Sequence, residues 1–182
     1  MSKIHLVRHG KAAAGFGAHP DPGLDDTGRA QASAVARLLS PEGPLPVYSS
    51  PLARAFQTAE ALAQIWQVDI QLEPRVAEIP SPTDDLAERA AWLAQAMQGA
   101  WDALDEMHQV WRAELAACLA EKTEDCVIFS HYVAINAAVG VATEDARMRI
   151  FGPDNCSVTT LENDDGKLSV VTLGRTADTK IN

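Results

Sequence analysis

The chain of 182 residues carries a net charge of −10 at pH 7, with 47% hydrophobic and 22% charged residues. This balance is typical of a soluble globular protein and excludes a disordered or fibrous chain, and the length suits a single core. An acidic chain also repels nucleic acid and anionic membranes, so neither is expected as a partner.

The first strand and helix are expected before residue 40. The segment KIHLVRH, residues 3–9, has the continuous apolar character of a strand buried on both faces of a parallel sheet. A loop rich in Gly and Pro follows, and Thr27 is expected to cap a helix over 28–39 with one apolar stripe. A helix after a strand is what a parallel crossover connection needs.

The same order repeats in the next segment. A short strand is expected at 45–50, after prolines that end the first helix. Ser50 stands before Pro51, which is typical of a cap with Pro at the first helical position, and the helix is expected to continue over 53–66. Residues 68–79 are expected to form a third strand and its exit.

The second half begins with a long helical stretch and ends with strands. Residues 84–122 are rich in Ala and are expected to form one bent helix, or two helices that separate near Gly99. A fourth buried strand is expected at 124–131, again ending in histidine, and a buried helix at 133–142. In residues 157–173, apolar and polar residues alternate on both sides of an Asp-Asp-Gly turn, which predicts a hairpin.

This alternation predicts an α/β fold, a three-layer sandwich with a mostly parallel central sheet and helices on both faces. In such sheets, ligands bind outside the carboxyl ends of the strands. Unusual residues at those ends are therefore the first candidates for a functional site.

Two arginines and two histidines stand at these strand ends. Arg8 and His9 follow the first strand, and His131 follows the fourth. Arg54 lies one helical turn beyond the second strand. Guanidinium groups donate paired, planar hydrogen bonds that suit phosphate oxygens, and histidine can be a nucleophile, donor or base near neutral pH. If the four side chains converge, they form a phosphate pocket with a nucleophile inside it.

Five pieces of the chain carry a family resemblance. In order and spacing, LVRHGKA, LDDTGRAQA, YSSPLARAFQTA, VAEI and FSHYVAIN resemble the histidine phosphatase superfamily, also called the phosphoglycerate mutase-like family. The resemblance spans residues 4 to about 160. It implies one histidine phosphatase-like domain over 1–182, in which residues 79–122 form a helical segment that covers the site.

The resemblance also implies a role for each strand-end residue. His9 matches the nucleophile that accepts the phosphoryl group as a phosphohistidine, and His131 matches the second histidine that donates to that group. Arg8 and Arg54 match the phosphate-binding arginines. Glu78, in VAEI, falls where many members have the acid that protonates the leaving oxygen. The family requires neither metals nor organic cofactors, so none are expected.

Some positions depart from the family pattern. Glu78 is followed by Ile-Pro-Ser-Pro instead of a Gly-x-Trp-Glu-Gly-like segment. Lys11 stands where many members have Glu or Gln. Its side chain is either an additional phosphate contact or a solvated lysine. Asn155 is a further candidate near the site, although a turn-forming role is the commoner reason for such an asparagine. An asparagine that the mutases keep shortly after Arg-His-Gly has no evident match in KAAAGFGAH, which favours a small phosphatase over a mutase.

The expected function is that of a metal-independent phosphatase that hydrolyses a phosphomonoester, with a phosphorylated small molecule as substrate. A phosphoglycerate mutase-type isomerase and a protein phosphohistidine phosphatase stay open as alternatives. A third alternative, outside enzymes, is an interaction module that binds phosphate and has lost catalysis. The sequence does not indicate the oligomeric state.

The other reactive side chains are expected to be structural. Cys118, Cys126 and Cys156 form no Cys-x-x-Cys pair, which indicates reduced, buried thiols and neither a metal site nor a disulfide. His5 is expected to be structural, and His108 to lie on the surface of the helical stretch. Without a signal peptide or a long apolar run, the chain is expected to be cytoplasmic.

Overall fold

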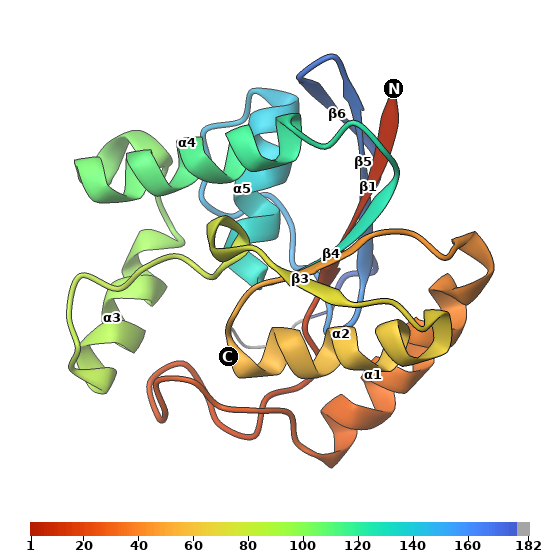
Figure 1. The fold of residues 1–182 in the computed structure, drawn as a ribbon. Helices are drawn as coiled ribbons and strands as arrows, with labels where there is room; N and C mark the ends of the chain where they lie inside the picture. The colour runs from red at the N-terminus through yellow and green to blue at the C-terminus, as the bar shows by residue number, and fades with distance from the viewer. Residues whose placement is uncertain (178–182) are drawn as a thin grey trace.

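The computed structural model describes residues 1–177, which contain one mixed sheet of six strands (Figure 1). The strands are β1 (Ser2–Arg8), β2 (Val47–Ser49), β3 (Ile70–Leu72), β4 (Cys126–Ser130), β5 (Val158–Asp164) and β6 (Lys167–Thr172). Their order across the sheet is β3-β2-β4-β1-β5-β6. The first four strands are parallel to one another, whereas β5 runs antiparallel to β1 and β6 runs antiparallel to β5.

Helices cover both faces of this sheet (Figure 1). α1 (Asp26–Leu39) and α2 (Ala53–Trp66) pack on one face, and α4 (Glu106–Ala120) and α5 (Tyr132–Thr143) pack on the other. α3 (Leu86–Ala96) lies below α4 in Figure 1, and short 3₁₀ helices occur at Ser40–Glu42, Pro74–Val76 and Trp101–Ala103. This arrangement confirms the predicted α/β sandwich with a mostly parallel sheet. Within residues 1–177, no helix has the length and apolar character needed to cross a membrane.

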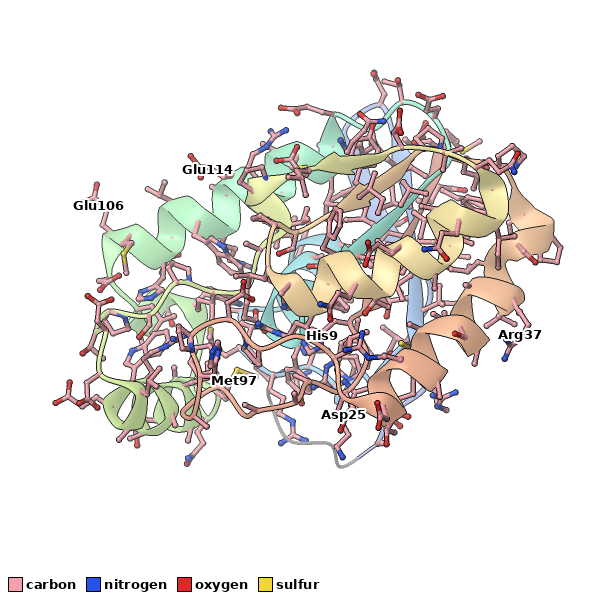
Figure 2. All side chains as sticks on the ribbon, turned by 60° about the horizontal axis from the view of Figure 1, so that its bottom comes forward. His9, Asp25, Arg37, Met97, Glu106 and Glu114 are labelled. Atoms are coloured by element: carbon pink, nitrogen blue, oxygen red, sulfur yellow. The ribbon has the colours of Figure 1, made fainter. Side chains whose placement is uncertain are left out.

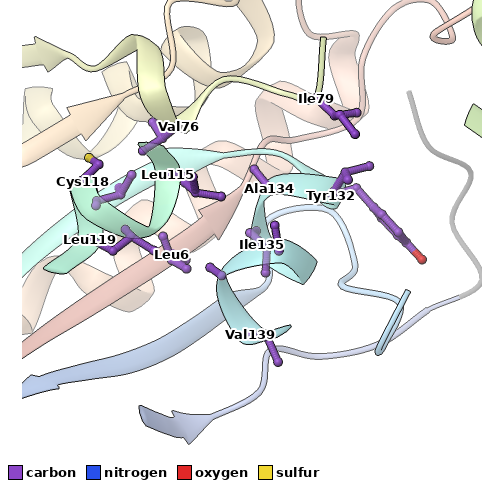
Figure 3. Close-up of a cluster of buried hydrophobic side chains, with 14 of the residues drawn as sticks. Leu6, Val76, Ile79, Leu115, Cys118, Leu119, Tyr132, Ala134, Ile135 and Val139 are labelled. Carbon is purple, nitrogen blue, oxygen red and sulfur yellow. The ribbon is translucent and has the colours of Figure 1, made fainter. Parts of the chain in front are cut away.

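Neighbouring residues of β1 face two separate hydrophobic cores. Val7 belongs to the cluster that includes Leu62 of α2. Leu6 belongs to the opposite cluster, with Leu115 of α4 and Ile135 of α5 (Figure 3). Burial of each such side chain contributes about 1.5–3 kcal/mol. The continuous apolar character of the strand follows from this burial on both faces.

The register between β1 and β4 determines where His9 and His131 lie. The two strands pair in parallel, with Arg8 opposite Ser130 at the last pair. The next residues along each chain are His9 and His131. The two histidines therefore leave the sheet side by side at its carboxyl edge.

α1 and α2 begin differently from the predictions. The side chain of Asp25, not Thr27, caps α1 by accepting a backbone N–H of its first turn at 2.7 Å. α2 begins at Ala53, whose N–H donates to the Asp21 carboxylate at 2.9 Å. Ser50 therefore does not cap α2. A carboxylate from the preceding loop satisfies that helix end instead, which local sequence order does not reveal.

The strand and the two helices between β2 and β4 are shorter than the stretches predicted for them. The third strand, β3, covers three residues at the sheet edge, and its exit forms a 3₁₀ helix. The long helical stretch is two helices, α3 and α4, with Gly99 between them as expected. Trp101 follows the break and is buried, and Asp105 caps α4. A buried Trp between two helices explains why they separate here, because the chain turns to pack that ring.

His108 is buried, so its predicted surface position is wrong. Its ring stacks on Trp92, with centroids 4.9 Å apart. Its nitrogens lie 2.6 Å from the Asp105 carboxylate and 3.0 Å from the Pro80 carbonyl oxygen. Both polar ring atoms have partners, which allows this histidine to be buried between α4 and the segment after Glu78.

Gly10 and Gly28 bring the end of β1 against the start of α1. A Cβ atom on Gly28 would lie 2.1 Å from the carbonyl oxygen of Lys11. Gly28→Ala is therefore expected to destabilise the fold by at least about 1–3 kcal/mol, the usual cost of overpacking, as measured by urea unfolding. Gly15→Ala is the control, because no atom lies within 4 Å of the added group. Equal stability of the two variants would contradict the close approach.

Candidate active site

Four buried polar residues converge at the carboxyl edge of the sheet. β1 delivers Arg8 and His9, β4 delivers His131, and the first turn of α2 delivers Arg54. Arg8, His9 and His131 are 0% exposed and Arg54 is 2% exposed. Figure 2 turns this edge toward the viewer and labels His9. The structure thus brings together the arginines and histidines that the sequence predicted as one cluster.

The surroundings of His9 determine which ring nitrogen carries the proton. Nδ1 lies 2.7 Å from the carbonyl oxygen of Gly10, which can only accept, so Nδ1 donates. Nε2 then carries the lone pair, and the Nε–H of Arg54 donates to it at 3.2 Å. Burial, followed by the charges of Arg54 and Arg8, lowers the pKa of His9 well below its ordinary value of 6.5. His9 is therefore neutral at pH 7, with a nucleophilic atom beside a guanidinium group.

The two buried arginines remain cationic at neutral pH. Nη1 of Arg8 donates to the carbonyl oxygen of Pro153 at 2.9 Å, and its guanidinium carbon lies 5.1 Å from the ring centroid of Tyr132. Burial lowers the pKa of Arg8 to about 10, still above neutral pH. Nη1 of Arg54 lies 3.8 Å from the Asp21 carboxylate. Two such forks beside one histidine can bind the oxygens of a phosphoryl group.

His131 lies next to His9, with ring centroids 5.1 Å apart. Its Nε2 lies 2.8 Å from the hydroxyl oxygen of Ser50, and that oxygen also accepts the N–H of Leu52 at 3.2 Å. The Ser50 hydroxyl can donate to Nε2, and in that arrangement the ring proton is on Nδ1. Within residues 1–177, Nδ1 of His131 has no hydrogen-bond partner. An N–H at that atom can donate to a phosphoryl oxygen.

Glu78 lies beside this cluster and also caps α5. Its Oε1 accepts the N–H groups of Ile79 at 3.0 Å and Ala134 at 3.1 Å, and its Oε2 accepts that of Val133 at 3.1 Å. Burial raises the pKa of Glu78 above its ordinary value of 4.5, while the backbone donors lower it. Burial lowers the pKa of Arg54, and the negative charge of Glu78 offsets part of that lowering. The carboxyl group is thus close enough to the arginines for either an acid or a structural role.

Lys11 and Asn155 occupy different positions relative to the cluster. The ammonium group of Lys11 pairs with Asp25 at 3.0 Å, and its side chain is 53% exposed. Asn155 is buried, and its Nδ2 donates to the carbonyl oxygen of His9 at 3.0 Å. The solvated interpretation suits Lys11 in this structure, whereas Asn155 fixes the backbone of the candidate nucleophile.

Thr58 and Ser50 also contact the cluster, and neither is among the site residues predicted from the sequence. The hydroxyl group of Thr58 accepts the N–H of Gly10 at 3.0 Å and donates its own O–H to the carbonyl oxygen of Arg54 at 2.7 Å. It therefore ties α2 to the end of β1. The spacing of four residues between Arg54 and Thr58 could have indicated this link, because such residues share one helix face. Nothing in the local sequence indicates the contact between Ser50 and His131.

The three cysteines and His5 have structural surroundings. Burial raises the pKa of Cys118, Cys126 and Cys156 to about 12, so these thiols are not nucleophiles at neutral pH. His5 contacts the hydroxyl of Thr160 at 3.1 Å between strands, away from the carboxyl edge. Residues 1–177 contain no group of three or more His, Cys, Asp or Glu side chains that could hold a metal ion.

The sequence is similar to probable phosphoglycerate mutases and to a phosphoserine phosphatase. The probable phosphoglycerate mutase GpmB of Photorhabdus laumondii is 28% identical over 187 residues, which cover 89% of this chain and 85% of that protein. Phosphoserine phosphatase 1 of Hydrogenobacter thermophilus is 35% identical over 83 residues, 43% of this chain and 39% of that protein.

The fold is similar to that of two solved structures. Phosphoserine phosphatase of Entamoeba histolytica, in complex with 3-phosphoglyceric acid, has a TM-score of 0.74 and 24% identity, with coverage of 97% of this chain and 98% of that chain. YhfR of Bacillus stearothermophilus has a TM-score of 0.73 and 19% identity, with coverage of 97% of this chain and 98% of that chain. The family model of the histidine phosphatase superfamily (branch 1) matches residues 4–176 and thus includes every residue of the buried cluster. On this evidence, the chain belongs to the histidine phosphatase superfamily.

Proposed function

We propose that this protein is a metal-independent phosphatase that hydrolyses a phosphomonoester through a phosphohistidine at His9. The observation that carries the proposal is the pair of contacts that the two nitrogens of that ring make. Nδ1 donates to the carbonyl oxygen of Gly10, which leaves the lone pair on Nε2 beside Arg54. A neutral imidazole at the centre of two buried guanidinium groups can attack a phosphorus atom whose charge the arginines neutralise.

The first step transfers the phosphoryl group to the enzyme. Arg8 and Arg54 bind the phosphoryl oxygens, and Nε2 of His9 attacks phosphorus in line with the ester oxygen. As the N–P bond forms, the P–O bond to the alcohol breaks, and the leaving oxygen takes a proton from Glu78. The N–H of His131 donates to a phosphoryl oxygen and stabilises its charge.

The second step regenerates the enzyme. Water attacks the phosphohistidine and gives a proton to the carboxylate of Glu78. The N–P bond breaks, its electron pair returns to Nε2 of His9, and inorganic phosphate leaves. Two displacements of lower barrier replace one difficult hydrolysis.

A small phosphorylated molecule is the proposed substrate. The phosphoserine phosphatase of Entamoeba histolytica, which shares the fold, was solved with phosphoserine and with 3-phosphoglyceric acid. We also propose that residues 1–182 form one phosphatase domain, in which residues 79–122 lie over the site. The GpmB relatives favour a mutase as the second candidate, since their similarity extends over most of this chain.

The test measures phosphate release from a panel of phosphomonoesters near pH 6–7.5, with the protein treated with a chelator. We expect turnover by the chelated protein and loss of it in His9→Ala. His5→Ala is the matched control, because His5 lies on the same strand outside the cluster. A 32P-labelled phosphoprotein, trapped during turnover, is expected to be stable to alkali and labile to acid, as a phosphohistidine is.

Three results would overturn the proposal. Full activity of His9→Ala would exclude the phosphohistidine, and activity that depends on added metal would exclude the metal-independent mechanism. Isomerisation of phosphoglycerate faster than its hydrolysis would establish the mutase instead.

A further inference from the structure

We propose that His108 of α4 is a positioning residue for Glu78, because it holds the backbone of the segment that follows that carboxylic acid. This inference rests on the proposed function and adds a residue to the same reaction. Within residues 1–177, the ring nitrogens of His108 form hydrogen bonds only with Asp105 and Pro80. Its effect on the reaction therefore passes through the chain that it holds.

Three neighbours fix the orientation of the His108 ring, which is 1% exposed. Nε2 lies 3.0 Å from the carbonyl oxygen of Pro80, which can only accept, so Nε2 donates. On the other side of the ring, Nδ1 lies 2.6 Å from the carboxylate of Asp105, the N-cap of α4. Trp92 of α3 stacks on the ring with centroids 4.9 Å apart. A fixed donor is thus aimed at the Pro80 carbonyl.

The segment that His108 holds is stiff. Residues 79–82 read Ile-Pro-Ser-Pro, and each proline fixes its own φ and restricts the residue before it. The N–H of Ile79 donates to Oε1 of Glu78 at 3.0 Å. The Ile79 side chain is 2% exposed, in the same cluster as Ala134 of α5 (Figure 3). A restraint on the Pro80 carbonyl therefore reaches the peptide that contacts the carboxyl group.

Few other contacts restrain this segment. Within residues 1–177, the other hydrogen bonds of residues 80–84 are internal or reach the cap and first turn of α3. The bond from His108 is thus the one that joins residues 80–84 to α4. Without it, these residues can shift together with α3 and carry the backbone of Glu78 with them. Misplacement of a reacting group by about 1 Å can slow a reaction by roughly 10²-fold.

The kinetic test uses His108→Phe, which keeps a ring to stack on Trp92 but cannot donate to Pro80. A displaced acid slows only esters whose leaving oxygen needs a proton. For the best alkyl phosphate of the panel, we expect kcat to fall by roughly 10- to 100-fold. The loss on p-nitrophenyl phosphate is expected to be much smaller. Inhibition by inorganic phosphate should be as strong as in the wild-type protein, because the arginines are unchanged.

Two further variants separate the hydrogen bond from packing. His108→Gln keeps an amide N–H that reaches the position of Nε2, so it is expected to recover most of the lost rate. Gln109→Met is the matched control. Gln109 is the next residue on α4, and it donates to the carbonyl oxygens of Trp101 and Leu104 and not to residues 80–84. In Gln109→Met, the ratio of the two ester rates should equal that of the wild-type protein.

Three kinetic results would overturn the proposal. Equal losses on the two esters in His108→Phe, together with a selective loss in Glu78→Gln, would show that His108 only stabilises the fold. Absence of recovery in His108→Gln would show that the donor to Pro80 is not the cause. The same selective loss in Gln109→Met would show that any loosening of α4 has this effect.

Amide hydrogen exchange, followed by NMR, separates this proposal from the proposed function because it needs no turnover. Val133 and Ala134 donate their N–H groups to Glu78, whereas Ile135 of the same helix donates to a backbone carbonyl oxygen. In His108→Phe we expect faster exchange at the first two amides and an unchanged rate at Ile135.

This selective increase supports the positioning role even if the wild-type protein hydrolyses no ester, in which case only the phosphatase activity fails. It also supports that role if Glu78→Gln shows no selective loss, in which case only the acid role of Glu78 fails. Unchanged exchange at Val133 and Ala134, or an equal increase at Ile135, overturns the positioning role of His108.

Discussion

Arg54→Met is expected to reduce kcat/KM by roughly 10³- to 10⁵-fold, the range found for arginines that stabilise a transferring phosphoryl group. Arg54 is buried and donates to Nε2 of His9 at 3.2 Å, so it lies where the phosphoryl group would arrive. Methionine retains the apolar stem but supplies neither charge nor donors. Steady-state kinetics with the best substrate of the panel measure the loss.

The same variant is expected to change the acid side of the pH profile. The charge of Arg54 helps to lower the pKa of His9, although burial is the larger cause. Without that charge the pKa of His9 rises, so the histidine becomes protonated and inactive at a higher pH than in the wild-type protein. Loss of activity on acidification should therefore begin at a higher pH in Arg54→Met.

Two further arginine variants test whether the guanidinium group of Arg54 accounts for the loss of activity. Arg54→Lys keeps the charge but not the planar fork, and is expected to recover less than a tenth of the lost activity. Arg37→Met, on the exposed side of α1 and far from His9 in Figure 2, is expected to have wild-type kinetics. Activity of Arg54→Met within tenfold of the wild-type value, with the fold intact by circular dichroism, would contradict the assigned role.

Glu78→Gln is expected to slow hydrolysis of alkyl phosphates by roughly 10²- to 10⁴-fold, the usual contribution of a general acid. An alkoxide leaves poorly without a proton, whereas a nitrophenolate leaves without one. The loss on p-nitrophenyl phosphate is therefore expected to be much smaller than the loss on an alkyl ester. A ratio of the two losses near one would indicate that Glu78 acts only by capping α5.

The alkaline side of the pH profile provides an independent measurement. Burial raises the pKa of Glu78, so the protonated form persists above pH 4.5 and disappears as the pH rises through the raised value. Activity on alkyl esters should fall with that deprotonation in the wild-type protein. Glutamine does not titrate, so Glu78→Gln should lack this fall.

Stability must be measured in parallel, because Glu78 also accepts three backbone N–H groups at 3.0–3.1 Å. The amide nitrogen of glutamine would face at least one of these donors. An unsatisfied buried donor costs about 1–3 kcal/mol, which urea unfolding would detect. Kinetics are therefore compared at a temperature where both proteins are folded.

The sequence by itself determined the chemistry of the cluster. Arg8 and His9 stand at the end of an apolar strand, and His131 at the end of another, so the rule for parallel sheets predicts that they meet. The motif around Arg54 predicted a second guanidinium group in the same cluster. Strand and helix patterns also predicted the α/β sandwich, because hydrophobic periodicity depends on local sequence and on which face is buried.

Only the tertiary structure decided what lies around those residues. Asp21 caps α2 from a loop, Ser50 contacts His131, and Glu78 caps α5, although each pair of partners is far apart in the sequence. The ring of His108 is satisfied by Asp105 of its own helix cap and by the carbonyl oxygen of Pro80, and the Pro80 contact is the one that the helix alone could not show. Contacts of this kind depend on register and packing between separate elements, and no local pattern encodes them. The proton on Nδ1 of His9 follows from such a contact, and with it the proposed nucleophile.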